Sequence, residues 1–353
     1  MADLTPMMQQ YMATKEQYKD CILFYRLGDF YEMFFDDALV ASKELEITLT
    51  GKNCGQEERA PMCGIPYHAA DSYLTKLVNK GYKVAICEQV EDPKLAKGIV
   101  KREVIRIVTP GTNLNMMSLE ESRNNYLMCI AYTEDKIGIA VVDALTGDFY
   151  VTEVSDTKKL NDEIVKFSPS EIICNDNFLV SGYSIDDLRE RLGISINKID
   201  AWHFEEDSCQ KLLCKHFKVN TLTALGVDDF MAGQIAAGAV LAYLYETQKN
   251  SLSNITHLNP YIASKYMLLD SATRRNLELT ETLREKQKKG SLLWVLDKTK
   301  TAMGARLLRT YLEQPLIEQA DIVLRQEAVG DLLAHPMSRE ELREYLSPIY
   351  DLE

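Results

Sequence analysis

The segment LFYRLGDFYEMFF at residues 23–35 holds six aromatic side chains among thirteen residues. Gly28 interrupts them, and a glycine permits a sharp turn out of a strand because it has no Cβ. One prediction is a strand, a turn and a helix whose aromatic rings all enter the core. The alternative is that some of Phe30, Tyr31 and Phe34 project from the turn. An exposed ring beside a carboxylate can stack on a nucleic-acid base while the carboxylate bonds the base edge.

The residues around this segment alternate between strand and helix patterns, which predicts α/β packing for residues 1–112. Acidic residues open the pattern at 36–46, where the N-terminus of a helix attracts negative charge. The elements expected in this block are helices at 36–46 and 69–78 and strands at 21–26, 84–88 and 101–108.

Two further blocks follow a polar stretch, 113–125, that predicts a linker. Residues 126–258 open with successive strand patterns and end in a long Ala- and Gly-rich helix, which is typical of a mixed sheet covered by helices. Residues 259–353 show helical patterns only. The helices expected there include 271–289, 301–312 and 318–334. A chain of 353 residues in this order is expected to be multidomain, α/β followed by all-α, and to be a fragment of something longer.

The charge balance gives two opposing indications about nucleic acid. A formal net charge of −13 argues against binding, because affinity for phosphates requires clustered cations. Residues 94–106, however, carry five cations and one acid, and residues 284–309 carry eight cations and two acids. Such runs are either basic strips that face nucleic acid or ordinary solvated faces.

Composition also bears on the compartment. No apolar run approaches the ~20 residues that span a bilayer, and the N-terminus lacks a secretory pattern. Eight cysteines without a C-x-x-C pair indicate reduced thiols. A cytoplasmic location without a membrane partner is therefore expected.

Few motifs suggest catalysis or a metal. No P-loop, dinucleotide-binding glycine pattern, HExxH or GxSxG occurs. Cys209, Cys214 and His216 are close in sequence, but their spacing fits no common zinc site and a helical core explains them better. Asp143 at a strand end, with Asp176 further on, leaves open a nuclease that binds Mg²⁺. The simpler interpretation is that these acids lie in turns and on the surface.

At GDFYEMF, residues 28–34, the sequence resembles the MutS family of DNA mismatch-recognition proteins. Further segments resemble the same family in the same order. They are TPMMQQY at 5–11, PMCGIPYHA at 61–69, VAICEQVEDP at 84–93, RIVTPGT at 106–112, LDSATRRNLEL at 269–279 and TAMGARLLRTYLEQPL at 301–316. The resemblance covers nearly the whole chain, although residues 126–258 match more loosely.

The resemblance implies a role for each block. Residues 1–112 would be the mismatch-binding domain, 126–258 a ribonuclease-H-like connector without a catalytic role, and 259–353 the start of the helical core or lever domain. The family's DNA clamp and its ATPase, with ATP and Mg²⁺, would lie further on, so the chain itself would hold no complete enzyme and no cofactor. A homodimer, a MutL-type partner on the connector and a bacterial, nucleoid-associated location are also implied.

The resemblance further implies site residues. In the family's Phe-x-Glu motif, Phe30 would wedge beside the mispaired base and Glu32 would bond that base. Arg102, Arg106 and Lys52 would contact the DNA backbone. A mismatch has already lost part of its stacking, so a kink costs less there, and Glu32 repels the phosphates of intact duplex. The chain alone is expected to bind DNA poorly; a Mg²⁺-dependent nuclease and a protein-interaction scaffold are the alternatives.

Overall fold

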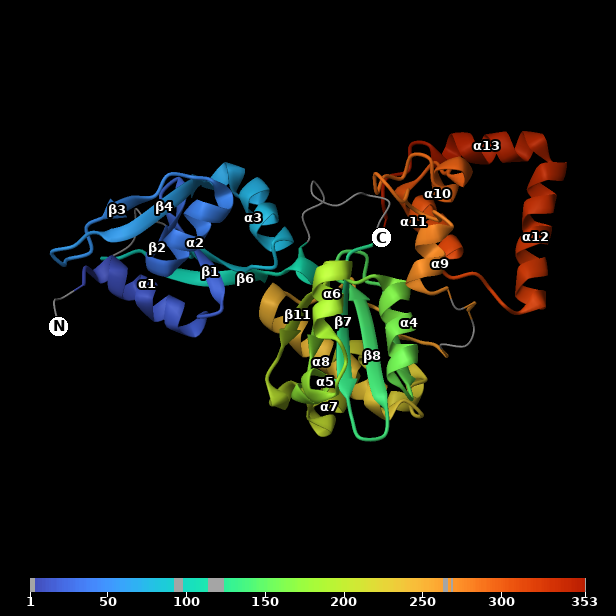
Figure 1. Ribbon diagram of the computed structural model, residues 1–353, viewed down its shortest axis with the longest axis horizontal. Helices are drawn as coiled ribbons and strands as arrows, with labels where there is room; N and C mark the ends of the chain where they lie inside the picture. The colour runs from blue at the N-terminus through green and yellow to red at the C-terminus, as the bar shows by residue number, and fades with distance from the viewer. Residues whose placement is uncertain (1–3, 92–97, 114–123, 263–265, 268, 353) are drawn as a thin grey trace. The chain divides into compact units, whose positions relative to one another are not determined.

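The computed structural model describes residues 4–91, 98–113, 124–262, 266–267 and 269–352. It divides into two compact units, coloured along the chain in Figure 1. The first unit comprises Met1–Ser118 and Ala242–Leu252, and the second comprises Leu119–Leu241 and Ser253–Glu353. Lys94 and Lys97 of the basic run and residues 114–123 of the predicted linker lie outside the described residues.

The first unit is built on a six-stranded mixed sheet with the strand order β3-β4-β2-β1-β5-β6. Of its neighbouring pairs, only β1 and β5 are parallel. The strands are β1 (Cys21–Leu27), β2 (Phe30–Phe34), β3 (Thr50–Lys52), β4 (Ala60–Pro66), β5 (Lys83–Gln89) and β6 (Arg102–Val108). The predicted strands correspond to β1, β5 and β6, whereas β2, β3 and β4 were not predicted.

Helices cover both faces of this sheet, as Figure 1 shows. Helix α1 (Pro6–Gln17) starts with Pro6 at its first position, where the missing N–H costs nothing, and packs Met8 and Tyr11 on one face. Helices α2 (Phe35–Leu45) and α3 (Ala70–Asn79) pack on the other face. The helices predicted at 36–46 and 69–78 are confirmed as α2 and α3. Because apolar residues lie on both sides, the first five residues of β1 are buried.

The second unit contains another six-stranded mixed sheet, with the order β11-β10-β7-β8-β9-β12. Strands β7, β8 and β9 form an antiparallel meander, while β10 is parallel to β7, and β11 to β10. The strands are β7 (Tyr126–Tyr132), β8 (Ile137–Asp143), β9 (Phe149–Val154), β10 (Glu171–Cys174), β11 (Ser195–Lys198) and β12 (Asn259–Pro260). The sheet therefore extends two residues beyond the predicted domain boundary at 258. The mixed α/β class is confirmed, and the ribonuclease-H-like fold stays a prediction.

Helices pack closely on this sheet. A Cβ at Gly138 of β8 would collide with the carbonyl of Ala232, so the start of α8 lies directly against the strand. All seven residues of β8 are buried. The helices of this part are α4 (Thr157–Phe167), α5 (Asp176–Val180), α6 (Ile185–Leu192), α7 (Glu206–Phe217) and the first part of α8 (Met231–Gln248), whose residues 242–248 belong to the first unit. The predicted burial of the Ala-rich helix is confirmed, since Ala236, Ala237 and Val240 are inaccessible to solvent.

The C-terminal part of the second unit is helical. It contains α9 (Ser271–Asn276), α10 (Leu292–Leu296), α11 (Ala302–Glu313), α12 (Gln319–Ala334) and α13 (Pro336–Leu346). The helices predicted at 301–312 and 318–334 are confirmed, but the helix at 271–289 is wrong beyond Asn276. Glu278 takes a positive φ of 48°, and the next residues fold back so that the Leu292 N–H bonds the Glu278 carbonyl. No helix in the described part of the chain is long and apolar enough to cross a membrane.

Candidate nucleic-acid interface

The candidate site lies at the tip of the β1–β2 hairpin. Leu27 pairs with Phe30, which leaves only Gly28 and Asp29 in the loop. Gly28 has φ +58°, a value that L side chains rarely adopt and that two-residue hairpins require. The predicted turn at Gly28 is confirmed, but the chain enters a second strand before the helix, and this strand fixes which side chains point outward.

Alternation along β2 separates its side chains into two sets. Tyr31 and Met33 belong to the core beneath α2 and α3. Phe30, Glu32 and Phe34 lie on the opposite face, the face that α1 covers. The ring of Phe34 lies 4.9 Å from that of Tyr11 of α1 and is fully buried.

Phe30 alone of the six aromatic residues is exposed. Its side chain is 47% accessible, whereas the other five are buried or half-buried, namely Phe24, Tyr25, Tyr31, Phe34 and Phe35. The prediction that all six rings enter the core is wrong for Phe30, because α1 covers Phe34 and leaves the outer end of β2 open. The alternative, that some of Phe30, Tyr31 and Phe34 project from the turn, holds for Phe30, while Tyr31 and Phe34 are buried.

Tyr31 is tied to the opposite side of the sheet. Its hydroxyl donates a hydrogen bond to Glu88 of β5, which also pairs with Arg26 at 3.4 Å. Burial, together with the bond to this carboxylate, raises the pKa of Tyr31. Tyr31 therefore points away from Phe30 and Glu32, as strand alternation predicts.

Glu32 forms an ion pair across two neighbouring strands. The Lys52 Nζ of β3 lies 2.5 Å from Glu32 Oε2, and their side chains are 32% and 15% accessible. On β4, which lies between them, Gly64 pairs with Glu32, so no side chain stands over the carboxylate. The Lys52 ammonium also lies 5.6 Å from the centre of the Phe34 ring. The structure thus brings Phe30, Glu32 and Lys52 together on one face.

Arg102 lies on the same face but is already engaged within the unit. Its Nε donates to the carbonyl of Arg26 at 2.7 Å, and its Nη1 donates to Gln10 Oε1 at 3.0 Å and to the carbonyl of Val100 at 2.9 Å. The guanidinium also lies 5.2 Å from the Tyr25 ring. These contacts connect α1 to β1 and β6, and the role of Arg102 as a DNA-backbone contact stays a prediction.

Arg106 lies on the opposite face because β6 contains a bulge. Ile86 pairs with Arg106 while Cys87 pairs with Val104, so Ile105 is an extra residue. The Arg106 side chain turns toward the α3 side, where burial lowers its pKa, and its Nε has no partner among the described residues. The structure therefore does not bring Arg106 together with Phe30.

Sequence reasoning missed Tyr67 next to the hairpin. Its backbone N–H bonds the Asp29 carbonyl at 3.0 Å, and its side chain is 45% accessible. The Arg26 guanidinium lies 3.8 Å from the centre of its ring and donates to the Gly28 carbonyl at 2.5 Å. Only its place in the segment PMCGIPYHA could have drawn attention to it, because a single tyrosine carries no periodic signal.

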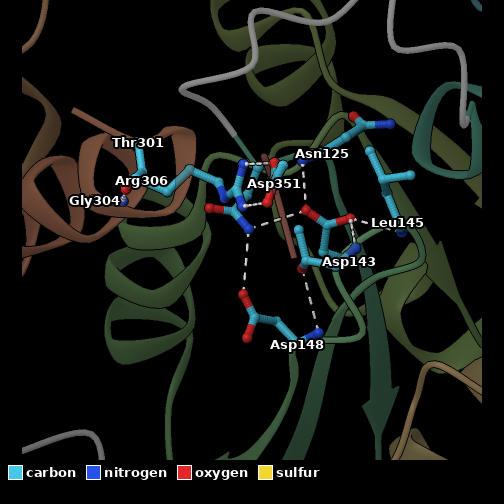
Figure 2. A network of polar contacts seen from close by, with 10 residues as sticks. Asn125, Asp143, Leu145, Asp148, Thr301, Gly304, Arg306 and Asp351 are labelled. Carbon is cyan, nitrogen blue, oxygen red and sulfur yellow. Dashed lines mark hydrogen bonds and ion pairs between the residues drawn. The ribbon is translucent and has the colours of Figure 1, made fainter. Parts of the chain in front are cut away.

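The carboxylate singled out in the second block has a structural role. Asp143 is 2% accessible and accepts hydrogen bonds from the backbone N–H groups of Asn125 at 3.1 Å and Leu145 at 2.9 Å, as Figure 2 shows. It also accepts from Asn124 Nδ2 at 3.0 Å and from the Thr146 N–H at 3.3 Å. These four donors fix the turn between β8 and β9 and connect it to the residues just before β7.

The nuclease alternative built on Asp143 and Asp176 is wrong. Asp143 pairs with Tyr126 at the start of β7, whereas Asp176 follows Cys174, which pairs with Ile130 near the end of β7. The two acids thus lie at opposite ends of the sheet, more than about 13 Å apart at ~3.3 Å per residue. In the described part of the chain, no three His, Cys, Asp or Glu residues are placed to hold a metal ion.

The cysteines and histidine near residue 210 are part of the local packing. The Cys209 Sγ is buried and donates to the carbonyls of His203 and Ile235, and the His216 Nε2 lies 2.8 Å from the Ile255 carbonyl. Burial raises the pKa of Cys209 to about 12, which keeps the thiol protonated.

A second polar centre connects the sheet of the second unit to its C-terminal helices. Lys166 pairs with Glu163 at 3.1 Å and lies 3.9 Å from the centre of the Tyr261 ring; burial lowers the lysine pKa. Arg274 donates to the carbonyl of Lys166 at 3.4 Å and to that of Glu313 at 2.8 Å. These two carbonyls lie at the ends of α4 and α11, where helices leave carbonyls without an internal partner.

The exposed Phe30 ring and the Glu32–Lys52 pair lie on one open sheet face, and such side chains on a rigid scaffold define a candidate binding site. The family description MutS domain I matches residues 5–116, MutS domain II matches 125–256 and MutS domain III matches 272–353. Together they account for nearly the whole chain. The chain therefore belongs to the MutS family, and the resemblance inferred from its motifs is confirmed.

Curated relatives match the chain from end to end. It is 67% identical to the DNA mismatch repair protein MutS of Lachnoclostridium phytofermentans, over 100% of this chain and 38% of the relative. It is 54% identical to the protein of the same name from Ruminiclostridium cellulolyticum, over 100% of the chain and 40% of that relative. The corresponding protein of Acetivibrio thermocellus is 55% identical, over 100% and 41%. The chain thus spans about two fifths of the length of these relatives.

Proposed function

We propose that this chain contains the part of a DNA mismatch repair protein that recognises mispaired or unpaired bases in duplex DNA. The observation that carries the proposal is the single exposed ring of an aromatic cluster. Phe30 is 47% accessible at the tip of a hairpin and shares its strand face with Glu32. The names of the relatives support the same function.

The proposed mechanism begins with the Phe30 ring. Inserting an apolar wedge between base steps costs a few kcal/mol of unstacking per step. A mismatched pair has already lost part of its pairing and stacking energy, so the same wedge costs less there. The hairpin holds the ring on two paired strands, which limits the conformational entropy lost when it binds. Discrimination then comes from the deformability of the DNA.

Glu32 supplies the second part of the mechanism. Its carboxylate lies two residues from Phe30 on the same face, the distance at which it can accept a hydrogen bond from a base displaced by the ring. Near intact duplex, a carboxylate approaching phosphates is unfavourable. A bond to the displaced base offsets this cost only at a defective pair. Arg102 would add a backbone contact.

Several properties of the family are proposed for the whole protein. An ATPase with ATP and Mg²⁺, a DNA clamp and a homodimer would belong to the parts of the relatives that this chain does not span. The second unit would dock a MutL-type partner, in a cytoplasmic protein associated with the nucleoid. Without the clamp and dimer, the chain alone is expected to bind DNA weakly, because linked subunits raise the effective concentration on DNA.

The test is a paired titration of a duplex with one central G·T mismatch and the matched duplex, using the protein at the full length of its curated relatives. Phe30→Ala is expected to lose about 1–3 kcal/mol of mismatch binding, the range for base–aromatic stacking, with little change on matched DNA. Leu39→Ala is the control, since Leu39 of α2 is equally exposed at 47%. Full discrimination by Phe30→Ala would contradict the proposal.

A further inference from the structure

We infer that Lys52 determines mismatch specificity by acting on Glu32, in place of the DNA-backbone contact expected from the sequence. The inference rests on the proposed function of Phe30 and Glu32 and assigns Lys52 a role as their positioning residue. Three observations support it: the partner of the ammonium, the path of the side chain, and the state of the carboxylate.

The Lys52 ammonium forms an ion pair with Glu32. Its Nζ lies 2.5 Å from Glu32 Oε2, a short charge-assisted contact, and two thirds of the side chain is buried. Lysines that contact a DNA backbone usually present a solvated ammonium on a flexible stem. A phosphate contact by Lys52 would first have to break this pair and would leave the Glu32 carboxylate uncompensated beside the phosphates.

The path of the Lys52 side chain explains how the pair is held. Lys52 pairs with Ala60 of β4, whereas Glu32 pairs with Gly64, so the lysine must reach diagonally across the sheet. The intervening ring is Phe34, whose centre lies 5.6 Å from the ammonium. Phe34 is fixed beneath α1, and a cation near a ring face is favoured. The ring thus supports the lysine along its reach.

The contact with Lys52 leaves one oxygen of Glu32 able to accept a hydrogen bond from a base. Lys52 engages Oε2, while Oε1 has no hydrogen-bond partner among the described residues. A carboxylate oriented through one oxygen loses less conformational entropy when the other oxygen accepts a bond. The lysine charge also balances the carboxylate as the site approaches the duplex. Lys52 therefore sets both the orientation of Glu32 and its electrostatic cost.

The experiment is a double-mutant cycle in the full-length form, with matched and G·T-mismatched duplexes titrated over a range of salt. In the protein that retains Glu32, Lys52→Met is expected to lower the ratio of mismatched to matched affinity roughly tenfold. In the Glu32→Gln background, the same change is expected to alter this ratio by less than about twofold, because the lysine no longer has a carboxylate to orient. Lys52→Arg should restore most of the ratio.

The result that overturns the inference is equally defined. If Lys52 contacts a phosphate, Lys52→Met weakens binding to both duplexes in both backgrounds and reduces the salt slope by about one. Lys80→Met is the control for loss of one charge, since Lys80 pairs with Glu44 at 2.7 Å in the same unit. Circular dichroism checks the fold of each variant. If the unmodified protein shows no mismatch preference, the proposed function itself fails, and this outcome is separate from the cycle.

Discussion

Glu32 and Asp143 are both carboxylates on strands of six-stranded mixed sheets, yet their surroundings differ. Glu32 lies on a partly open face and has one partner in the described part of the chain, the Lys52 side chain. Asp143 is buried and accepts from four donors, three of them backbone N–H groups. One oxygen of Glu32 has no hydrogen-bond partner among the described residues, whereas both oxygens of Asp143 accept hydrogen bonds. The number and kind of hydrogen-bond donors thus separate a carboxylate with a structural role from one that can bind a ligand.

The two sheets differ in the same way. In the second unit every residue of β8 is buried. In the first unit β2 is buried at Phe34 and open at Phe30, because α1 covers only part of its face. In a sheet that is covered along its whole length, polar side chains such as Asp143 bond the backbone of nearby turns. A sheet left open at one end can present side chains to a ligand, and this predicts that stability and binding depend on different residues.

The largest expected effect is on stability, at Asp143. Asp143→Ala removes the acceptor of four hydrogen bonds and leaves buried N–H groups without a partner, so it should lower the free energy of unfolding of the second unit by about 3 kcal/mol. Both tryptophans, Trp202 and Trp294, belong to this unit, so their fluorescence in a urea titration reports on it. Glu32→Ala should change the same measurement by less than about 0.5 kcal/mol. Equal losses of unfolding free energy for Asp143→Ala and Glu32→Ala would contradict the proposed difference between the two carboxylates.

The next effect concerns the other polar centre of the second unit. Arg274→Met should cost about 2 kcal/mol, because two carbonyls at helix ends lose a charged donor. Arg275→Met is the matched control, since Arg275 is exposed. Urea unfolding followed by tryptophan fluorescence measures both. A loss of stability in Arg275→Met as large as in Arg274→Met would show that the bonds do not matter.

A smaller effect is expected in binding. Glu32→Ala removes the carboxylate and frees the Lys52 ammonium, so affinity for matched duplex should rise by about fivefold while discrimination falls. Titrations on matched and mismatched duplexes at one salt concentration test this. Glu44→Ala removes the same charge elsewhere in the unit and should leave discrimination unchanged. A drop in matched affinity after Glu32→Ala would refute the electrostatic account.

The smallest effect separates the two faces of β2. Tyr31→Phe loses only the hydrogen bond to Glu88 and should cost about 0.7 kcal/mol in the first unit, with discrimination unchanged. Hydrogen exchange of the β1 and β2 amides reports the stability change, and the paired titration reports the binding. If Tyr31→Phe lost discrimination while Phe30→Ala kept it, the residue that inserts into DNA would be Tyr31 and not Phe30.

Sequence patterns predicted the elements whose signals are local. The acidic first turn and apolar spacing of residues 36–46 sufficed for α2. Strand β2 was missed because its five residues follow a turn and run straight into a helix, with too little length for alternation to show. The helix expected at 271–289 ends at Asn276 because the backbone at Glu278 turns left-handed, which composition does not reveal.

The candidate site was predictable in its residues but not in its geometry. The motif pointed to Phe30 and Glu32, whereas the exposure of Phe30 depends on how far α1 reaches across the sheet. The partner of Glu32 lies two strands away and depends on a β4 that was not predicted. The separation of Asp143 from Asp176 depends on strand direction. Each of these is a tertiary property that a single sequence does not encode locally.

The bulge at Ile105 has an evolutionary consequence. Arg102 and Arg106 are four residues apart, a spacing that would place both on one side of a regular strand, and the extra residue reverses the parity between them. Deleting residue 105 would leave the two arginines three positions apart in a regular strand, so they would stay on opposite faces and Val104 and Val108 would keep their separate cores. Position 105 is therefore a place along β6 where the chain can lose one residue without changing which side chains enter each core.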